Sequence, residues 1–497
     1  MSTGFLDTGV DTAGFLAGLL TGYEPTAILR EQAQNADDAC HKAGVSGWLK
    51  ISFSPTRLTI ENPSVLSDDD WRRLAKTSSR GKAKDAEQTG EFGVGFWSVL
   101  HLTDAPAITS GRFAATIDQL NGRQAELREL TDALAGTRFE LELRTSPTEA
   151  SSQLEVQAVT PALLNQLEQS FEEQIPELLL FAKSLTRIEL NLRDGSTVVG
   201  ERKTASACGA VETVTVTVST DRGATETTFL CLRGVVPNAP EGRSADVAVA
   251  FPVDGDSDLA GRIFCTFPTE TATGLPFSIN AHFFAAMDRR SIAQVGPHGD
   301  WNDRVFTEAG RLVGSNLEDL FASPGPTFEE RLGWFVRRHG AVPEISRRRD
   351  FCLTAIDERA VDAAIIRDRS GTSRRGRDLV LLDAIADQLL GTEIAQSVER
   401  PGDPNLVDLY SRWGVREWRR SDVARWIADN APEPGTALAS APTFMSTVAF
   451  LKRLLDYCSP VSAELGSACL ALGTDDRLYS LGAGDIPKPG GPLETLV

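Results

Sequence analysis

Near the start of the chain, apolar positions recur with the period of an amphipathic helix. Between residues 28 and 40 these positions are Leu29, Ala33, Ala36 and Cys40. With about 3.6 residues per turn, this spacing puts them on one face of a helix, and Glu31, Asn35 and Asp38 fall on the opposite face. We therefore predict two helices within residues 11–43, broken near Gly22 to Pro25, with the amphipathic helix over 26–40.

The next segment has the period of two that is typical of strands. Residues 47–62 are predicted to form a hairpin, because Leu49, Ile51 and Phe53 alternate with polar residues before the chain turns. A long helical pattern covers residues 161–184. Further strands are predicted at 186–193, 211–219, 225–233, 246–252 and 262–267.

The patterns divide the chain into three predicted segments. Residues 1–145 and 146–325 mix helices and strands, and residues 326–497 are mainly helical. The prolines and glycine of Ser323–Pro326 would stop a helix arriving from Leu317–Phe321, which favours a linker there. Beyond it, helices are expected at Val423–Asp429, capped by Ser421 and Asp422, and at Phe444–Cys458. The fold class predicted for the chain is α+β.

A glycine-rich segment at 89–100 is a candidate ligand loop. Gly90, Gly93 and Gly95 allow the backbone to approach a ligand and to reach positive φ angles. The apolar run from Val94 to Leu102 can begin a helix whose first N–H groups would face a phosphate. The spacing matches neither the dinucleotide fingerprint nor the Walker loop. A glycine-rich turn before a buried helix is the alternative interpretation.

The polar face of the 26–40 helix suits a nucleotide bound with a metal ion. A carboxylate such as Glu31 can orient or deprotonate a water molecule. The amide oxygen of Asn35 can ligate Mg²⁺, which takes oxygen ligands and keeps several waters. The alternative is the solvated face of an ordinary amphipathic helix.

Taken together, these segments resemble the ATP-binding domain of the GHKL superfamily, in particular its heat-shock chaperone branch. The boxes that carry the resemblance are Leu29–Ala39, Gly90–Ser98 and Gly136–Phe139, in the order of that branch. Downstream, Gly261–Pro268, Thr273–Phe284, Asp288–Ser291 and Asp300–Asn302 look like the repeating region of the sacsin family. The resemblance covers roughly residues 5 to 325. It implies a Bergerat (GHKL) α/β sandwich over 1–145, a mixed α/β middle domain over 146–325 and a mainly helical region over 326–497.

The resemblance also assigns roles to single residues. Glu31 would orient the attacking water, Asn35 would be the protein ligand of Mg²⁺, and Arg30 and Asp38 would support the site. Arg289 or Arg290 would reach the γ-phosphate, and Thr137 would lie near the adenine. The residues that would close over the phosphates are Gly90, Phe92, Gly93, Val94, Gly95 and Phe96. The polar stretch before them suggests a lid in which Lys76 could meet phosphate; an exposed basic loop is equally compatible with it.

One position departs from the family pattern. An Asp-x-Gly box normally follows a hydrophobic strand, and its Asp contacts the adenine amino group. Here Asn62 takes the Asp position and Ser64 the Gly position. An Asn oxygen can still accept a hydrogen bond from an amine, although without the charge that strengthens it. A proline turn closing a hairpin explains Pro63 equally well.

Composition is that of an ordinary globular protein. Hydrophobic residues make up 41% of the chain and charged residues 24%. No stretch approaches the roughly 18 uninterrupted apolar residues of a membrane span, and no secretory signal is evident. The 7 scattered cysteines lack a C-x-x-C pair, which favours reduced thiols in the cytoplasm. The 5 scattered histidines disfavour a zinc site.

The formal net charge of −19 disfavours nucleic acid as a partner. Arginines nevertheless concentrate in residues 347–425. Interleaved acidic residues favour salt-bridged, solvated helices there, and a phosphate-binding or acid-binding surface is the alternative.

Two functions follow as expectations. The first is a chaperone-like conformational switch that binds ATP with Mg²⁺, hydrolyses it slowly and acts on a protein client or partner subunit; closure coupled to ATP is compatible with a homodimer. The second is a nucleotide-gated binding or scaffold module with little or no hydrolysis, for example in bacterial stress or defence. Asn62 and Ser64 favour the second, and Glu31 favours the first.

Overall fold

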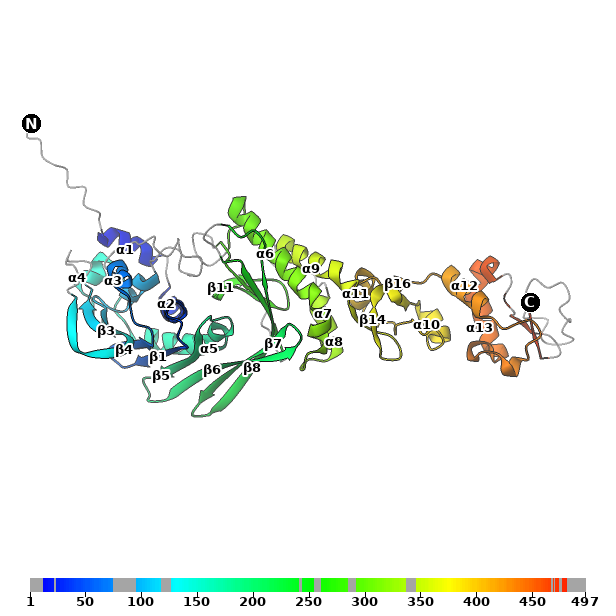
Figure 1. Cartoon of the computed structure of the whole chain (residues 1–497), viewed down its shortest axis with the longest axis horizontal. Coiled ribbons are helices and arrows are strands. Elements are labelled where there is room, and N and C mark those ends of the chain that lie inside the picture. The colour runs from blue at the N-terminus through cyan, green and yellow to red at the C-terminus, as the bar shows by residue number, and fades with distance from the viewer. Residues whose placement is uncertain are drawn as a thin grey trace, which may run out of the picture. The chain divides into compact units, whose positions relative to one another are not determined.

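The structure of the chain is a computed structural model (Figure 1). It describes residues 12–21, 24–74, 95–117, 127–240, 244–253, 261–284, 292–336, 346–465, 468, 470–472 and 476–480. The chain divides into two compact units. The first comprises Met1–Leu312, Ser323–Pro326 and Ala341–Cys352, and the second comprises Val313–Ala322, Thr327–Gly340 and Leu353–Val497.

A single mixed sheet of twelve strands organises the first unit. Its order is β11-β10-β12-β9-β8-β7-β6-β5-β1-β2-β4-β3. The β1–β5 and β10–β12 pairs are parallel, and the remaining pairs are antiparallel. The strands are β1 (Gly47–Phe53), β2 (Arg57–Asn62), β3 (Ala107–Thr116), β4 (Arg128–Glu142), β5 (Leu185–Asn191), β6 (Thr197–Cys208), β7 (Val211–Thr220), β8 (Gly223–Val235), β9 (Asp246–Pro252), β10 (Arg262–Cys265), β11 (Phe267–Ala272) and β12 (Ser278–Ala281).

Helices cover the sheet around its centre. Those that lie wholly in this unit are α1 (Thr12–Thr21), η1 (Pro25–Ala27), α2 (Ile28–Ala43), α3 (Asp68–Leu74), η3 (Gly95–His101), α4 (Glu149–Gln153) and α5 (Pro161–Leu180). Two further helices, α6 (Gly296–Ser315) and α9 (Ser346–Ala360), belong to this unit only up to Leu312 and Cys352. α2 packs on β1, β2 and β5, and α5 packs on β5, β6 and β7. α2 and α5 also contact each other.

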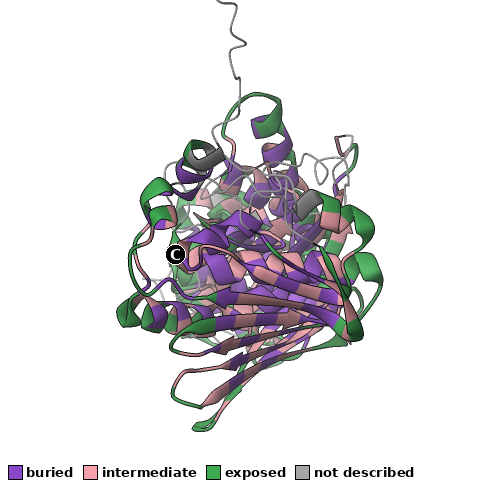
Figure 2. Ribbon diagram, turned by 90° about the vertical axis from the view of Figure 1, so that its left-hand side faces the viewer, coloured by how far each residue is buried: buried purple, intermediate pink, exposed green. Residues whose placement is uncertain are grey.

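The main core lies between these helices and the sheet. Alternate residues of β1, namely Leu49, Ile51 and Phe53, are buried, as the period of two requires. They pack in one cluster with residues of α2 and α5 such as Leu29 and Ile175. Figure 2 shows buried positions alternating with less buried ones along the strands. Burial of the apolar face of each element in this core therefore holds the helices against the sheet.

The second unit is built mainly from short helices. They are α7 (Leu317–Ala322), α8 (Phe328–Phe335), η4 (Gly376–Asp378), α10 (Ala384–Leu390), α11 (Pro404–Arg412), α12 (Arg420–Asn430), η5 (Leu438–Ser440), η6 (Thr443–Met445), α13 (Val448–Cys458) and η7 (Ser459–Leu465). Three strand pairs accompany them: β13 (Ala364–Arg367) with β14 (Ser373–Arg375), β15 (Val380–Leu381) with β16 (Arg416–Glu417), and β17 (Ala471–Leu472) with β18 (Leu478–Tyr479). The carboxylate of Asp357 accepts bonds from Arg412 at 2.6 and 2.7 Å and from the indole of Trp413 at 2.9 Å.

The arginines of residues 347–425 mostly have acidic or aromatic partners. Arg374 pairs with Asp368 at 2.6 Å, Arg377 with Asp362 at 2.8 Å and Arg412 with Asp357. Within the first unit, Arg348 pairs with Asp303 at 2.6 Å. Others lie over aromatic rings: Arg367 over Phe328, Arg416 over Trp418 and Arg420 over Tyr457. This agrees with the favoured interpretation of this region, in which its arginines form salt bridges.

The mixed α/β character of the prediction is confirmed. The two N-terminal helices, the hairpin at 47–62 and the helix at 161–184 are confirmed as α1, α2, β1–β2 and α5. The helix expected at Val94–Leu102 is a 3-10 helix, η3, and the cap of α12 is Arg419 with Asp422 rather than Ser421. β6 was not predicted, since its buried positions stop halfway along the strand. The boundaries at 145 and 325 stay predictions; β5 pairs with β1, so the sheet continues past residue 145.

Candidate functional site

The helix α2 carries the acidic and amide residues singled out in the sequence. Its buried stripe includes Leu29, Ala33, Ala36 and Cys40, as predicted. Glu31 and Asn35 are half-buried, and Asp38 is buried. The helix ends where Gly44 adopts the left-handed conformation with φ of 66° and donates to the carbonyls of Cys40 and His41. The apolar stripe against the sheet thus fixes which way the polar residues face.

Asp37, between the predicted site residues, anchors α2 to the sheet. Its side chain is fully buried. Its two carboxylate oxygens accept hydrogen bonds from the backbone N–H groups of Lys183 at 2.9 Å, Ser184 at 2.7 Å and Leu185 at 2.8 Å. These bonds hold α2 to the start of β5. Sequence analysis missed Asp37, because only the distant partner segment reveals its role.

We expect Asp37→Ala to destabilise the chain strongly. Removing a buried acceptor leaves three backbone donors without it, and hydrogen bonds to charged groups contribute about 1.5–3 kcal/mol each, so the expected loss is at least about 3 kcal/mol. Urea denaturation followed by circular dichroism measures it. The control is Asp69→Ala, an exposed residue paired with Arg72, which should change the free energy of unfolding by less than about 0.5 kcal/mol. Equal effects of the two substitutions would contradict the anchoring role.

Asn62 and Thr137, predicted at the adenine end, lie directly opposite each other on β2 and β4. The Asn62 Oδ1 accepts bonds from Ser64 N at 3.1 Å and Ser64 Oγ at 2.6 Å. The Thr137 Oγ1 donates to the Ser64 carbonyl at 2.7 Å and lies 2.7 Å from Ser110 Oγ. All four residues are buried. They form one polar network, in which the oxygen of Asn62 already has a partner in Ser64.

This network reaches α2 through Cys40. Burial raises the pKa of the Cys40 thiol to about 11, and the nearby Asp37 carboxylate adds to this, while hydrogen bonds with Ser64 oppose it. Ser64 therefore contacts α2 as well as Asn62 and Thr137. The predicted adenine end and the predicted catalytic helix are neighbours in the fold.

Gly136 allows β4 to approach β2 at this point. Its φ is 131°, and a Cβ atom there would lie 2.3 Å from the carbonyl oxygen of Asn62. The atom that the added Cβ would meet belongs to the backbone of Asn62, so no rotation of a side chain can relieve the contact. The glycine before Thr137 is thus required by the strand pairing.

We expect Gly136→Ala to cost at least about 2 kcal/mol of unfolding free energy, from the clash and from the positive φ together. The control is Gly195→Ala, where φ is 89° but no atom lies within 4 Å of the added Cβ. It isolates the backbone strain and should cost about 1 kcal/mol. Thermal denaturation of both variants measures the difference in their stability. If the Gly136→Ala protein is as stable as the Gly195→Ala control, β4 can move away from β2 and the glycine is not required.

The C-terminal end of the glycine-rich segment lies beside α2. Gly95 begins η3, which packs against α2. Phe96 is buried and lies 5.8 Å from Phe139 between ring centroids. The buried Arg144 donates to the carbonyls of Leu100 at 3.1 Å and His101 at 2.9 Å, at the other end of η3, and pairs with Asp104 at 2.6 Å. These contacts fix η3 at both ends.

Arg30, predicted to support the site, lies near the α5 carboxylate of Glu177. Burial raises the pKa of Glu177, and the positive charges of Arg262 and Arg30 oppose that rise. Glu177 and Arg262 form an ion pair at 3.1 Å. Arg30 therefore contributes charge between α2 and α5.

The other predicted site residues fall outside the described part of the chain. They are Lys76, Gly90, Phe92, Gly93, Val94, Arg289 and Arg290.

Within the described ranges, no group of three or more His, Cys, Asp or Glu side chains is placed to hold a metal ion. No helix in those ranges has both the length and the hydropathy of a membrane span. The cysteines at 40, 208, 231, 265, 352 and 458 are free thiols.

Comparisons with known proteins point to sacsin-like sequences. A model of the Sacsin domain matches residues 48–121, which include β1, β2, η3 and β3. Human "Sacsin" is 24% identical over 383 residues, covering 56% of this chain and 8% of the relative. "Protein NO VEIN" of Arabidopsis thaliana is 24% identical over 333 residues, covering 62% of this chain and 12% of the relative. The chain is thus similar to sacsin-type proteins and spans only a small part of the length of these relatives.

One solved structure matches the chain weakly. "Crystal Structure of N terminal domain of a DNA repair protein" matches with a TM-score of 0.35 and 12% identity, covering 59% of this chain and 94% of that chain. A likeness at this level says nothing about function.

Proposed function

We propose that this chain binds ATP with Mg²⁺ and acts as a chaperone-like conformational switch on protein partners, hydrolysing ATP slowly. The observation that supports it is the proximity of three segments far apart in sequence: α2 with Glu31 and Asn35, η3 at the end of the glycine-rich segment, and the network of Asn62 and Thr137. In the GHKL resemblance these segments surround one nucleotide. The layer of α2 and α5 over the sheet is compatible with a Bergerat sandwich.

The donor set on α2 fits a magnesium ion bound with phosphate. Asn35 would supply one amide oxygen, and the remaining ligands of the hard cation would be phosphate oxygens and waters. A site of this kind does not need three or more protein carboxylates around the metal, and the described residues offer no such group. When bound, the ion would neutralise charge on the phosphates.

The chain's own residues would do the rest of the chemistry. Glu31 would accept the proton of the attacking water or orient it, and the half-buried setting of its carboxylate leaves it reachable from solvent. The glycine-rich segment would present backbone N–H groups to the phosphates. Either Arg289 or Arg290 would contact the γ-phosphate. Binding would shift the chain between two forms only by its difference in affinity for them.

The free thiols fit a reducing compartment, so we place the protein in the cytoplasm. The resemblance to the heat-shock branch supports a protein client or a partner subunit rather than nucleic acid.

A second candidate function is nucleotide-gated binding without turnover. The contact of Asn62 Oδ1 with Ser64 favours it, because that oxygen is engaged within the protein and lacks the charge of a carboxylate. Weak adenine recognition would then limit base selectivity and hydrolysis.

Calorimetric titration of the whole chain with ATP, ADP and GTP tests the binding proposal. We expect ATP to bind more tightly with Mg²⁺ than without it, and Asn35→Ala to weaken that binding about tenfold or more by removing the metal ligand. Gln34→Ala, a neighbouring half-buried residue of α2, is the matched control and should bind as the wild type does. Equal affinity of the Asn35 and Gln34 variants would refute the metal role, and equal affinity for ATP and GTP would refute adenine recognition at Asn62.

Phosphate release separates the two functions. If the chain is an ATPase, Glu31→Ala should lower the rate about 100-fold or more while ATP affinity is kept, because general-base catalysis contributes about 10²–10⁴-fold. Gln34→Ala again serves as the control. If wild type and Glu31→Ala both release no phosphate yet bind ATP, the chain is the non-hydrolysing module.

A further inference from the structure

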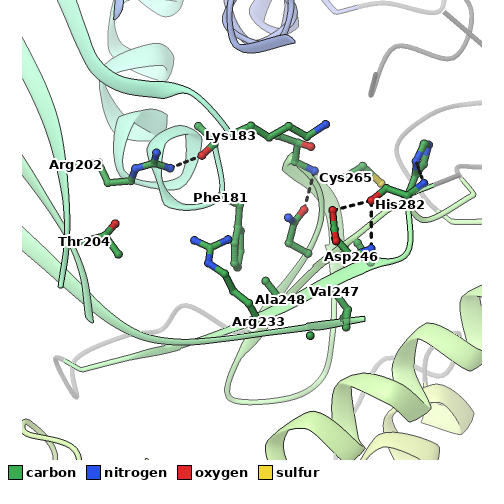
Figure 3. A pocket seen from close by; sticks show the side chains of 16 residues that line it. Phe181, Lys183, Arg202, Thr204, Arg233, Asp246, Val247, Ala248, Cys265 and His282 are labelled. Carbon is green, nitrogen blue, oxygen red and sulfur yellow. Dashed lines mark hydrogen bonds between the residues drawn. The ribbon is translucent and has the colours of Figure 1, made fainter. Parts of the chain in front are cut away.

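A cavity lies in the first unit, and its lining residues differ from the described residues predicted to bind nucleotide. Its volume is about 380 Å³, within the range of small-molecule sites. It is lined by β6, β8, β9 and β12, the β10–β11 turn and the residues that follow α5 (Figure 3). Of the residues predicted to bind ATP, none of those that the structure describes lines it. The cavity therefore needs an explanation of its own.

Positive charge predominates in its lining. Lys183, Arg202 and Arg233 contribute cations, and Asp246 is the one carboxylate among the lining residues. Asp246 accepts a hydrogen bond from Ser244 Oγ at 2.8 Å. Arg233 pairs with Glu212, just outside the lining, through its Nε at 2.9 Å. This contact with Glu212 is made through Nε, and Arg233 also lines the cavity.

Among the described residues, no carboxylate lies at ion-pair distance from Arg202. Backbone carbonyl groups hold its side chain instead. Its Nη1 donates to the carbonyls of Leu179, at 3.0 Å, and Ala182. Burial lowers the pKa of Arg202; the charge of Asp37 opposes this, and the charge of Arg233 adds to it. Figure 3 shows the guanidinium group of Arg233 beside Phe181, and that of Arg202 directed toward the backbone of the segment that follows α5. The positive charges of Arg202 and Arg233 therefore act on each other unfavourably, and an anion bound between them would relieve this repulsion.

The opposite side of the cavity contains a strained backbone. Thr266, the single residue between β10 and β11, has a φ of 70°, which is rare for a β-branched side chain. Its N–H donates to Asn280 Oδ1 at 2.7 Å, which holds the turn from β12. Both residues line the cavity. Strain of this kind costs about 1–3 kcal/mol and is concentrated at ligand clamps and active sites.

We propose that this cavity is a binding site for a small phosphate-bearing ligand. Arg202 and Arg233 bind the phosphate through guanidinium N–H groups, whose fork geometry matches phosphate oxygens. Phe181, Val247 and Ala248 form an apolar wall for the rest of the ligand. The Thr266 turn and Asn280 close the far side. The site is separate from the ATP site proposed above and does not depend on it.

Calorimetric titration of the whole chain with pyrophosphate, in the absence of nucleotide, tests this site. We expect Arg233→Gln to weaken binding about tenfold or more, since a lost charged hydrogen bond has that effect. Arg57→Gln is the matched control: it is also an exposed strand arginine in an ion pair, with Glu142, but it does not line the cavity. Asn35→Ala reports on the ATP site. Both of these variants should bind pyrophosphate as the wild type does.

The outcomes distinguish the two sites. Loss of binding in Asn35→Ala but not in Arg233→Gln would place pyrophosphate at the ATP site and overturn the proposal. Absence of binding by wild type, or equal weakening by Arg57→Gln and Arg233→Gln, would overturn it too. Arg202→Lys keeps the charge but loses the fork; we expect it to weaken binding, and thermal denaturation checks that it stays folded.

Discussion

The fully buried carboxylate of Asp37 joins the helix that carries the candidate site to the sheet beneath it. By accepting three backbone N–H groups at the start of β5, it sets the position of α2 along the sheet. The same β5 pairs in parallel with β1, so one side chain links the N-terminal helix, the hairpin that follows it and the later strands. A buried carboxylate without such partners would be very unfavourable. The position of α2 relative to β5 can therefore change little.

The first unit contains two kinds of candidate binding group near Asp37. The polar face of α2 offers carboxylate and amide oxygens, which suit a cation and its bound phosphates. The cavity after α5 offers guanidinium groups, which suit an anion directly. Asp37 and Arg202 are close enough for their charges to interact, and Lys183 both donates its N–H to Asp37 and lines the cavity. The segment after α5 is therefore shared between the anchor of one site and the wall of the other.

Local pattern predicted much of the fold. The apolar stripe of α2 and the hairpin were predicted because each buries one face. The strand at Asp246–Pro252 was predicted because its central residues form a continuous apolar run, which is buried. β6 escaped prediction because its second half is exposed and carries no alternation of burial. Asp37 and Arg144 also escaped it. Both are charged residues in an apolar setting, and only the distant backbone groups that they bind explain why they are buried.

The sequence by itself determined many of the elements, the polar face of α2 and the resemblance that links Glu31, Asn35, Asn62 and Thr137. It did so because helical and strand periods are local properties of the chain. Only the tertiary structure decided that Thr137 lies opposite Asn62, that Ser64 occupies the oxygen of Asn62, and that Arg202 and Arg233 face one cavity. These contacts depend on strand order and register, which bring together residues far apart in the chain. The local pattern of apolar and polar residues does not show which strands will pair.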